Sequence, residues 1–336
     1  MSSTRFSFFG WLIMLACGAC ARTTNTVFGA GYSLAVPVNA APGQIMNLTV
    51  QGIGAGLTQR VAATAFPLPY ALAGISVQLM QALPTQSMPA PLLAVSPVST
   101  CPNGAPLGNV TCGRYTVVTV QIPFELSLGC PLTDTVVCPA LVVATPAELI
   151  VSENGVAGGA IALNPVADQV HVANLCDLDV GTATGCYSTP LITHSDGSMV
   201  SINSPAKAGE EIVIYALGLG AANPPVATGQ ATPVPAPVMQ STPLVQNDFR
   251  VNAPPWKQLP EPLPACPVGG ACPGTATFVG MTPGSVGLYQ VNYVVPSTQS
   301  AVACGGAIQS NLTVTIVGTA SFDGAGICVV PAASGQ

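Results

Sequence analysis

The residues of this chain whose types could support catalysis are few. His194, Ser195 and Asp196 are the three residue types of a nucleophilic triad, and they stand in a row. A triad needs side chains that converge from separate elements, which sequence neighbours cannot do. Asp196-Gly197 is a turn dipeptide, so the sequence predicts a hairpin tip at this point. His171 is the only other histidine, which leaves little material for acid–base catalysis by histidine.

Paired carboxylates are the next chemistry to consider, because glycosidases need only two. Glu210 and Glu211 adjoin at a predicted strand entry, where successive side chains point to opposite faces. Asp177 and Asp179 begin a calcium-type loop, but Thr182 occupies the sixth position, where such a loop requires glycine. We therefore expect no enzymatic activity, no metal and no cofactor, and a secreted hydrolase is the least favoured alternative.

Cysteine is the remaining reactive side chain. Ten of the twelve cysteines lie beyond residue 100, and an even set in an exported chain favours disulfides. Pairing between sequence neighbours would close loops that are mostly rich in Gly, Pro, Asn or Thr, although sequence alone leaves the connectivity open. The candidate pairs are Cys101 with Cys112, Cys130 with Cys138, Cys176 with Cys186, Cys266 with Cys272, and Cys304 with Cys328.

An export signal is predicted at residues 1–21. Arg5 precedes the apolar run 6–16, and small residues follow it. A basic start, a short apolar stretch and an Ala-x-Ala-like end are the parts of a secretory signal, and the run is too short to span a membrane. Ala19-Cys20-Ala21 predicts cleavage before Arg22, while lipid attachment at Cys20 stays open. The mature chain is expected to be secreted or at the cell surface, without a transmembrane segment.

The charge of the chain limits its partners. Only 6% of the 336 residues are charged, the formal net charge is −6, and the seven basic residues are scattered singly. Neutralising a phosphate backbone takes a cluster of Lys and Arg, so nucleic acid is excluded as an expected partner. Few carboxylates also means few groups whose titration couples to folding, so stability is expected to be nearly flat across mildly acidic pH.

The elements that position these side chains are predicted to be short strands. Hydrophobic residues make up 49% of the chain, and 35 Gly and 33 Pro are spread between apolar runs, which favours strands joined by turns. A repeat is visible within this pattern. PGQIMNLTVQGIGAGL (42–57) aligns with AGEEIVIYALGLGAAN (208–223), and RYTVVTVQIP (114–123) resembles GLYQVNYVVP (287–296). The glycines shared by the first pair of segments are predicted to be turn glycines.

The repeat predicts an all-β chain of two tandem Ig-like β-sandwich domains with long Pro/Gly-rich loops and disulfides. The first domain is expected at residues 22–172, the second at 173–320, and a C-terminal tail at 321–336. The stretch 224–245 is rich in proline, which cannot donate to a sheet, and is expected to be an extended surface loop.

Three segments resemble a known family. PAPLLAVSP (89–97), SDGSMVSINSPAKAGEEIVIYALGLG (195–220) and MTPGSVGLYQVNYVVP (281–296) are similar to the uncharacterised Ig-like domain of secreted acidobacterial proteins, which is related in character to IPT/TIG sandwiches. The resemblance implies an Ig-like β-sandwich on exported proteins, often beside adhesive modules. No catalytic residues belong to this family, so the resemblance implies none here.

Two binding functions follow as hypotheses. The favoured one is a non-enzymatic secreted or cell-surface protein that acts as a structural, adhesion or self-association module, with a protein or polysaccharide partner or a second copy of itself. The alternative is a carbohydrate-binding module, which needs a planar aromatic platform. Aromatic residues are only 5% of the chain, and Trp256, Tyr289 and Tyr293 are the candidates for that platform.

Overall fold

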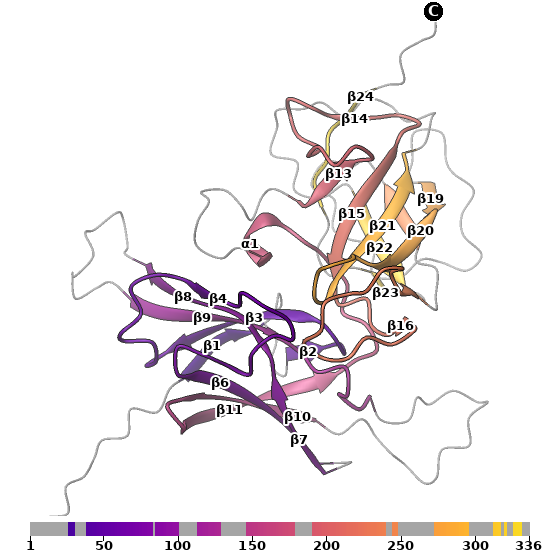
Figure 1. The fold of residues 1–336 in the computed structure, drawn as a ribbon. Coiled ribbons are helices and arrows are strands. Elements are labelled where there is room, and N and C mark those ends of the chain that lie inside the picture. Colours follow the sequence, from indigo (N-terminus) through magenta and orange to yellow (C-terminus); the bar gives the residue numbers. More distant parts are fainter. Residues whose placement is uncertain are drawn as a thin grey trace, which may run out of the picture.

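The structure of this chain is a computed structural model. It describes residues 26–30, 38–82, 85–100, 113–128, 146–178, 190–239, 244–247, 272–295, 312–316, 319–320 and 325–330. Apart from one helical turn, α1 (Leu175–Leu178), these residues form strands and their connections, which confirms the all-β prediction (Figure 1). The predicted signal segment lies outside the described residues.

The strands before residue 166 form two sheets, here called the first group. One sheet has the order β1 (Thr26–Ala30), β3 (Ile45–Gln51), β9 (Gly113–Gln121), β8 (Leu92–Thr100), β4 (Val61–Ala62). The other has the order β2 (Val38–Ala40), β11 (Val156–Pro165), β10 (Ala147–Glu153), β6 (Ile75–Gln81), β5 (Ala71–Leu72), with β7 (Gln86–Ala90) also on β6. The pairing of β2 with β11 is parallel, and the other pairings in both sheets are antiparallel.

The strands after residue 170 form the second group. Its main sheet has the order β12 (His171–Val172), β15 (Glu211–Leu217), β21 (Leu288–Val294), β20 (Phe278–Met281), β17 (Val238–Met239), β16 (Ala222–Asn223), with β13 (Ile192–His194) also on β15. A second sheet has the order β19 (Cys272–Thr275), β18 (Leu244–Asn247), β22 (Leu312–Ile316), β23 (Thr319–Ala320). The remaining pair is β14 (Ala206–Lys207) with β24 (Val329–Val330).

Each group of strands encloses its own apolar core. Burial alternates along β6, β3, β15 and β21, so one face of each strand is turned inward, as the pleat of a strand requires. Leu48 of β3 and Leu149 of β10 share the first core, although they lie in different sheets. Ile214 of β15 and Val314 of β22 share the second core in the same way. Sheet packed on sheet is therefore the arrangement within each group.

The predicted repeat is confirmed in the register of its two central strand pairs. Gly43 donates its N–H to the carbonyl of Ile122, 3.0 Å away, and Gly209 donates to Val295 in the same way at 2.8 Å. β3 then pairs antiparallel with β9 from Ile45 onward, and β15 pairs with β21 over the aligned residues. The two copies of the repeat therefore share one hydrogen-bonding pattern. The division into two domains of the same fold stays a prediction.

The glycine turn after each repeated strand is also the same. Gly52 and Gly54 have φ of 87° and 69°, and Gly218 and Gly220 have φ of 71° and 84°. All four values lie in the left-handed region that glycine adopts without steric cost, so the prediction of turn glycines holds.

Each of these turns is fastened by a hydroxyl from the neighbouring repeated strand. The Thr116 hydroxyl on β9 donates to the carbonyl of Ile53 at 2.9 Å. Tyr289, which occupies the aligned position of β21, donates its hydroxyl to the carbonyl of Gly220. Two side chains of different length therefore fasten equivalent turns, through carbonyls that are one position apart in the alignment.

A third apolar cluster joins the two groups. It contains Ile45 and Leu68 from the first group and Leu217 and Leu288 from the second. At Gly287, φ is 61°, and an added Cβ would meet the carbonyl oxygen of Gly43 at 2.5 Å. The two groups therefore pack backbone against backbone at this cluster, which we call the junction.

Three predicted boundaries differ from the structure. β12 lies before residue 173 but pairs with β15, so the second group begins earlier than the boundary at 172/173. Residues 325–330 are not a tail, because Ala325, Ile327 and Val329 are buried in the second core and β24 pairs with β14. The predicted loop 224–245 contains β17 and the start of β18. These strands are only a few residues long, too short for alternation to show in the sequence.

One carboxyl group makes the stability of the fold depend on pH, whereas the small number of charges predicts a nearly flat dependence. Burial raises the pKa of Asp168 to about 6, and its Oδ1 has no hydrogen-bond partner among the described residues. The folded chain therefore holds this proton more tightly than the unfolded chain. The stabilisation is fully present below about pH 4, the ordinary pKa of Asp, and is lost as pH rises through about 6.

We expect Asp168→Asn to remove this dependence, because the amide is neutral at every pH. The free energy of unfolding, measured by urea titration at pH 4.5 and pH 7, should fall with pH in the parent chain and change less in the variant. An identical slope in both proteins would contradict the assignment.

The junction is expected to be sensitive to truncation at Ile45, which is fully buried. Ile45→Ala should lower the free energy of unfolding by about 2–5 kcal/mol, the usual cost of removing a large buried aliphatic side chain. Val156→Ala is the matched control, because Val156 is 56% exposed and its truncation should change stability by less than about 0.5 kcal/mol. Chemical denaturation of both variants checks the expectation, and equal effects would contradict it.

Candidate functional site

Two of the three residues of the predicted aromatic platform are buried. Tyr289 and Tyr293 are core residues of β21, 0% and 1% exposed. Burial raises the pKa of Tyr293 to about 12 and that of Tyr289 further above its ordinary range. Both residues share the inward phase of β21 with Val291, which explains their burial. This part of the prediction was wrong, and Trp256 lies outside the described residues.

The predicted disulfide framework falls largely outside the described residues. Cys328 is buried and disulfide-bonded. Cys176 lies in α1 and Cys272 in β19. The other seven predicted members are Cys101, Cys112, Cys130, Cys138, Cys186, Cys266 and Cys304, all outside the described residues. The five pairings therefore stay a prediction.

The residues His194 to Asp196 behave as the sequence predicted. His194 ends β13, and Gly197 follows in the turn with φ of 85°. Asp196 accepts the hydroxyl and the N–H of Ser198 at 2.7 and 2.9 Å, and these bonds lower the pKa of its carboxyl. The carboxylate therefore fastens a hairpin tip.

His194 does, however, belong to another set of polar side chains. Its Nδ1 lies 2.8 Å from Oε1 of Glu210, and its Nε2 lies 3.1 Å from Oγ of Ser204. Serine, histidine and carboxylate are connected here in the order of a hydrolase triad. The sequence did not predict this set, because its members come from three segments that only the fold brings together.

The surroundings of Ser204 argue against a nucleophile. His194 Nε2 also lies 3.1 Å from the carbonyl oxygen of Ser204, an acceptor that competes for the same ring nitrogen. The N–H of Ser204 donates to the carbonyl of Ser201 at 3.1 Å. The next residue is Pro205, which has no N–H with which to stabilise an oxyanion. The arrangement joins three segments of the chain. Neither Ser204 nor Pro205 offers a free backbone N–H to an oxyanion.

His171 also has a structural environment. Its Nε2 lies 2.7 Å from Oδ2 of Asp177, and both side chains are almost fully buried. The same carboxylate oxygen accepts the N–H of Asn174 at 2.7 Å, where the chain enters α1. Asp177, the first residue of the calcium-type motif, is therefore engaged in fixing the start of the second group.

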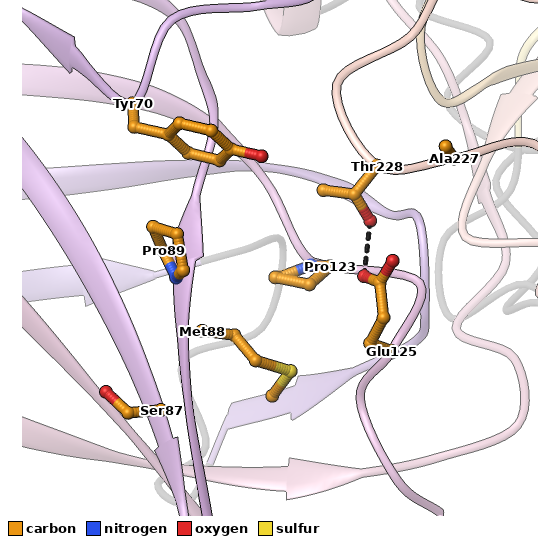
Figure 2. A pocket seen from close by; sticks show the side chains of 8 residues that line it. All are labelled: Tyr70, Ser87, Met88, Pro89, Pro123, Glu125, Ala227 and Thr228. Carbon is orange, nitrogen blue, oxygen red and sulfur yellow. Dashed lines mark hydrogen bonds between the residues drawn. The ribbon is translucent and has the colours of Figure 1, made fainter.

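An open pocket lies where the two groups of strands meet (Figure 2). Its volume is about 340 Å³, near the lower end of the range found for small-molecule sites. The first group supplies Tyr70, Ser87, Met88, Pro89, Pro123 and Glu125, and the second group supplies Ala227 and Thr228. In Figure 2 the ring of Tyr70 stands on one side, and Glu125 and Thr228 stand on the other.

The second-group wall of this pocket is held by hydrogen bonds to the first group. Thr228 Oγ1 accepts the N–H of Phe124 at 2.9 Å and donates to Oε2 of Glu125 at 2.6 Å. Gly229 donates its N–H to Oε1 of Gln121 at 2.7 Å, and its carbonyl accepts the N–H of Leu68 at 2.7 Å. These four bonds fix the loop that carries Ala227 and Thr228 against the first group.

The segment that carries Glu125 is fixed by glutamine side chains. Gln81 donates from Nε2 to the carbonyl of Ser127 at 2.7 Å, and its Oε1 accepts the N–H of Ser127 at 3.1 Å. Gln86 in β7 donates to Oε1 of Gln81 at 2.7 Å. These bonds fix the loop after β9 to β6 and β7. Glu125 therefore has a defined position beside Met88, although it does not lie in a strand.

Tyr70 is held from both sides along the chain. Leu68, two residues earlier, is buried in the junction, and the carbonyl of Pro69 accepts the N–H of Leu92 at 2.8 Å. β5 begins immediately after Tyr70, at Ala71. The backbone on each side is fixed while the tyrosine side chain is 48% exposed, so its ring is presented to solvent at a defined place.

Within the part of the chain that the structure describes, no group of three or more His, Cys, Asp and Glu side chains is placed to hold a metal ion. The described part of the chain also contains no helix long and apolar enough to cross a membrane.

Comparison with known proteins does not assign a family. No family model matches the chain, and no curated protein matches it. Among solved structures, the C-terminal domain of the AgI/II polypeptide BspA of Streptococcus agalactiae aligns at 9% identity over 87% of this chain and 94% of that one, with a TM-score of 0.16. A structure titled BspA_C_WT aligns with the same coverage, identity and TM-score. A TM-score this low assigns neither fold nor function.

The His194 set is expected to be structural. His194→Ala should lower the free energy of unfolding by about 1–3 kcal/mol, because it leaves Glu210 and Ser204 without their shared partner. A fluorophosphonate probe, which labels activated serines, should leave Ser204 unmodified in the parent chain when checked by mass spectrometry. Labelling of Ser204 that disappears in His194→Ala would contradict this and would favour the hydrolase alternative.

Proposed function

We propose that this chain is an exported, non-enzymatic adhesion module of the cell surface, built from two tandem Ig-like sandwiches that hold one binding pocket between them. The observation that carries the proposal is the braced pocket itself. Its walls come from both groups of strands, and the loop bearing Thr228 is fixed by bonds to Phe124, Glu125 and Gln121. A preorganised, open pocket loses little conformational entropy when a partner binds, because its walls are already ordered.

The composition supports a role outside the cell. The apolar segment after Arg5 and the Ala-x-Ala-like end favour export, and an even set of cysteines suits an oxidising compartment. With so few charged residues, binding to a neutral partner such as a polysaccharide or an uncharged protein face removes few charges from water. The surroundings of Ser204 favour a binding function over a hydrolytic one.

Export is tested by producing the full chain in a Gram-negative host. We expect the chain outside the cytoplasm, with Arg22 as its first residue by mass spectrometry. Cys20→Ser separates the two export routes: if Cys20 carries lipid, the parent chain is membrane-associated and the variant is released. A cytoplasmic chain that still begins at Met1 would overturn the export half of the proposal.

Adhesion is tested with cells of a non-adherent host that display the chain. We expect these cells to attach to surfaces coated with purified polysaccharides or extracellular matrix proteins, and cells that display Thr228→Val to attach less. The valine has nearly the same shape, but it cannot accept from Phe124 or donate to Glu125, so the pocket wall loses its fixed position. Val156→Ala, far from the pocket in sequence and exposed, is the control. Equal attachment of the displaying and the non-displaying cells would overturn the adhesion half.

A further inference from the structure

The chemistry of the pocket indicates the class of ligand that it binds. The inference of this ligand class rests on the proposed binding function. The pocket has an aromatic and apolar part: Tyr70, which is 48% exposed, stands on one side above Pro89, and Met88 and Pro123 line the pocket between Tyr70 and Glu125. The other side is polar, with the Glu125 carboxylate and the Thr228 hydroxyl (Figure 2). A ligand that fits must itself have an apolar face and a polar edge.

The polar groups of the pocket are suited to hydroxyl groups of a ligand. Thr228 uses its proton on one oxygen of Glu125, and Oε1 of that exposed carboxylate has no hydrogen-bond partner among the described residues. Ser87 accepts the Nε2 of Gln78 at 2.7 Å, so its own hydroxyl proton is available to donate. One acceptor and one donor on opposite walls match a molecule whose hydroxyls both donate and accept.

We propose that the pocket binds a neutral pyranose unit of a polysaccharide, with the C–H face of the sugar against the Tyr70 ring and its hydroxyls toward Glu125 and Ser87. A lysine or arginine side chain is the competing ligand, since it also suits an aromatic ring beside a carboxylate. The apolar wall argues for the sugar, because Met88, Pro89 and Pro123 offer nothing to a hydrated cation. The pocket is also open to solvent, so the sugar unit bound in it can belong to a longer chain.

The aromatic side chain is tested by affinity electrophoresis of the exported chain in gels that contain soluble β-glucan, xylan or galactomannan. We expect retardation by at least one of these polymers, and Tyr70→Ala should weaken it on the order of tenfold or more, as truncation of a central aromatic anchor does. Phe66→Ala is the matched control, because Phe66 is an aromatic residue with 51% exposure that does not line the pocket. Its binding should equal that of the parent chain.

Two conservative variants separate the sugar from a cation. Tyr70→Phe keeps the ring and should retain most of the retardation. Glu125→Gln keeps an acceptor oxygen and should weaken sugar binding several-fold without abolishing it, whereas a cationic ligand would lose most of its affinity. Circular dichroism and denaturation midpoints show that each variant is folded.

The outcomes distinguish this inference from the proposed function. If displaying cells attach but Tyr70→Ala attaches as well as the parent, adhesion stands and the sugar site is overturned. If the chain binds a lysine-rich peptide in a salt-sensitive manner and none of the three polymers, the ligand class is overturned. If the displaying cells do not attach at all, the proposed function falls, whatever the gels show.

Discussion

The backbone of Gly229 is the constraint on which the arrangement of this molecule depends. Its N–H and its carbonyl are both removed from water, and both are bonded by the first group, through Gln121 and Leu68. A buried peptide group that loses such partners costs on the order of 1–3 kcal/mol. The loop after β16 therefore has a fixed position only when the two groups of strands are packed together. The pocket beside it exists for the same reason.

The sequence predicted the repeated part of the fold in detail. The aligned glycines at 43 and 209 and the two Gly-x-Gly turns mark the beginning and end of equivalent strands, because each occupies a backbone conformation that other residues rarely adopt. The short strands were not predictable in this way. β24 has two residues, and its place in the second core depends on a parallel pairing with β14, more than 100 residues earlier in the sequence. No local pattern records such a pairing.

The candidate site, in contrast to the repeated strands, was not predictable from the sequence. Tyr289 and Tyr293 were named because aromatic residues are scarce, yet they alternate with polar residues in the phase of Val291, and that phase predicts burial. Tyr70 carries no comparable signal. It becomes prominent only because Leu68 and β5 fix the backbone on each side of it, and because a loop from the other half of the chain closes the pocket opposite. Three sequence-distant segments meet there, and their meeting is a property of the packing.

The composite wall of the pocket has an evolutionary consequence. A genetic crossover in the connection near residues 166–170 would separate Tyr70 and Glu125 from Thr228, and each fragment would carry only part of the pocket wall. A complete pocket is therefore inherited only when both halves are inherited together, although their strand pairing follows one repeated pattern.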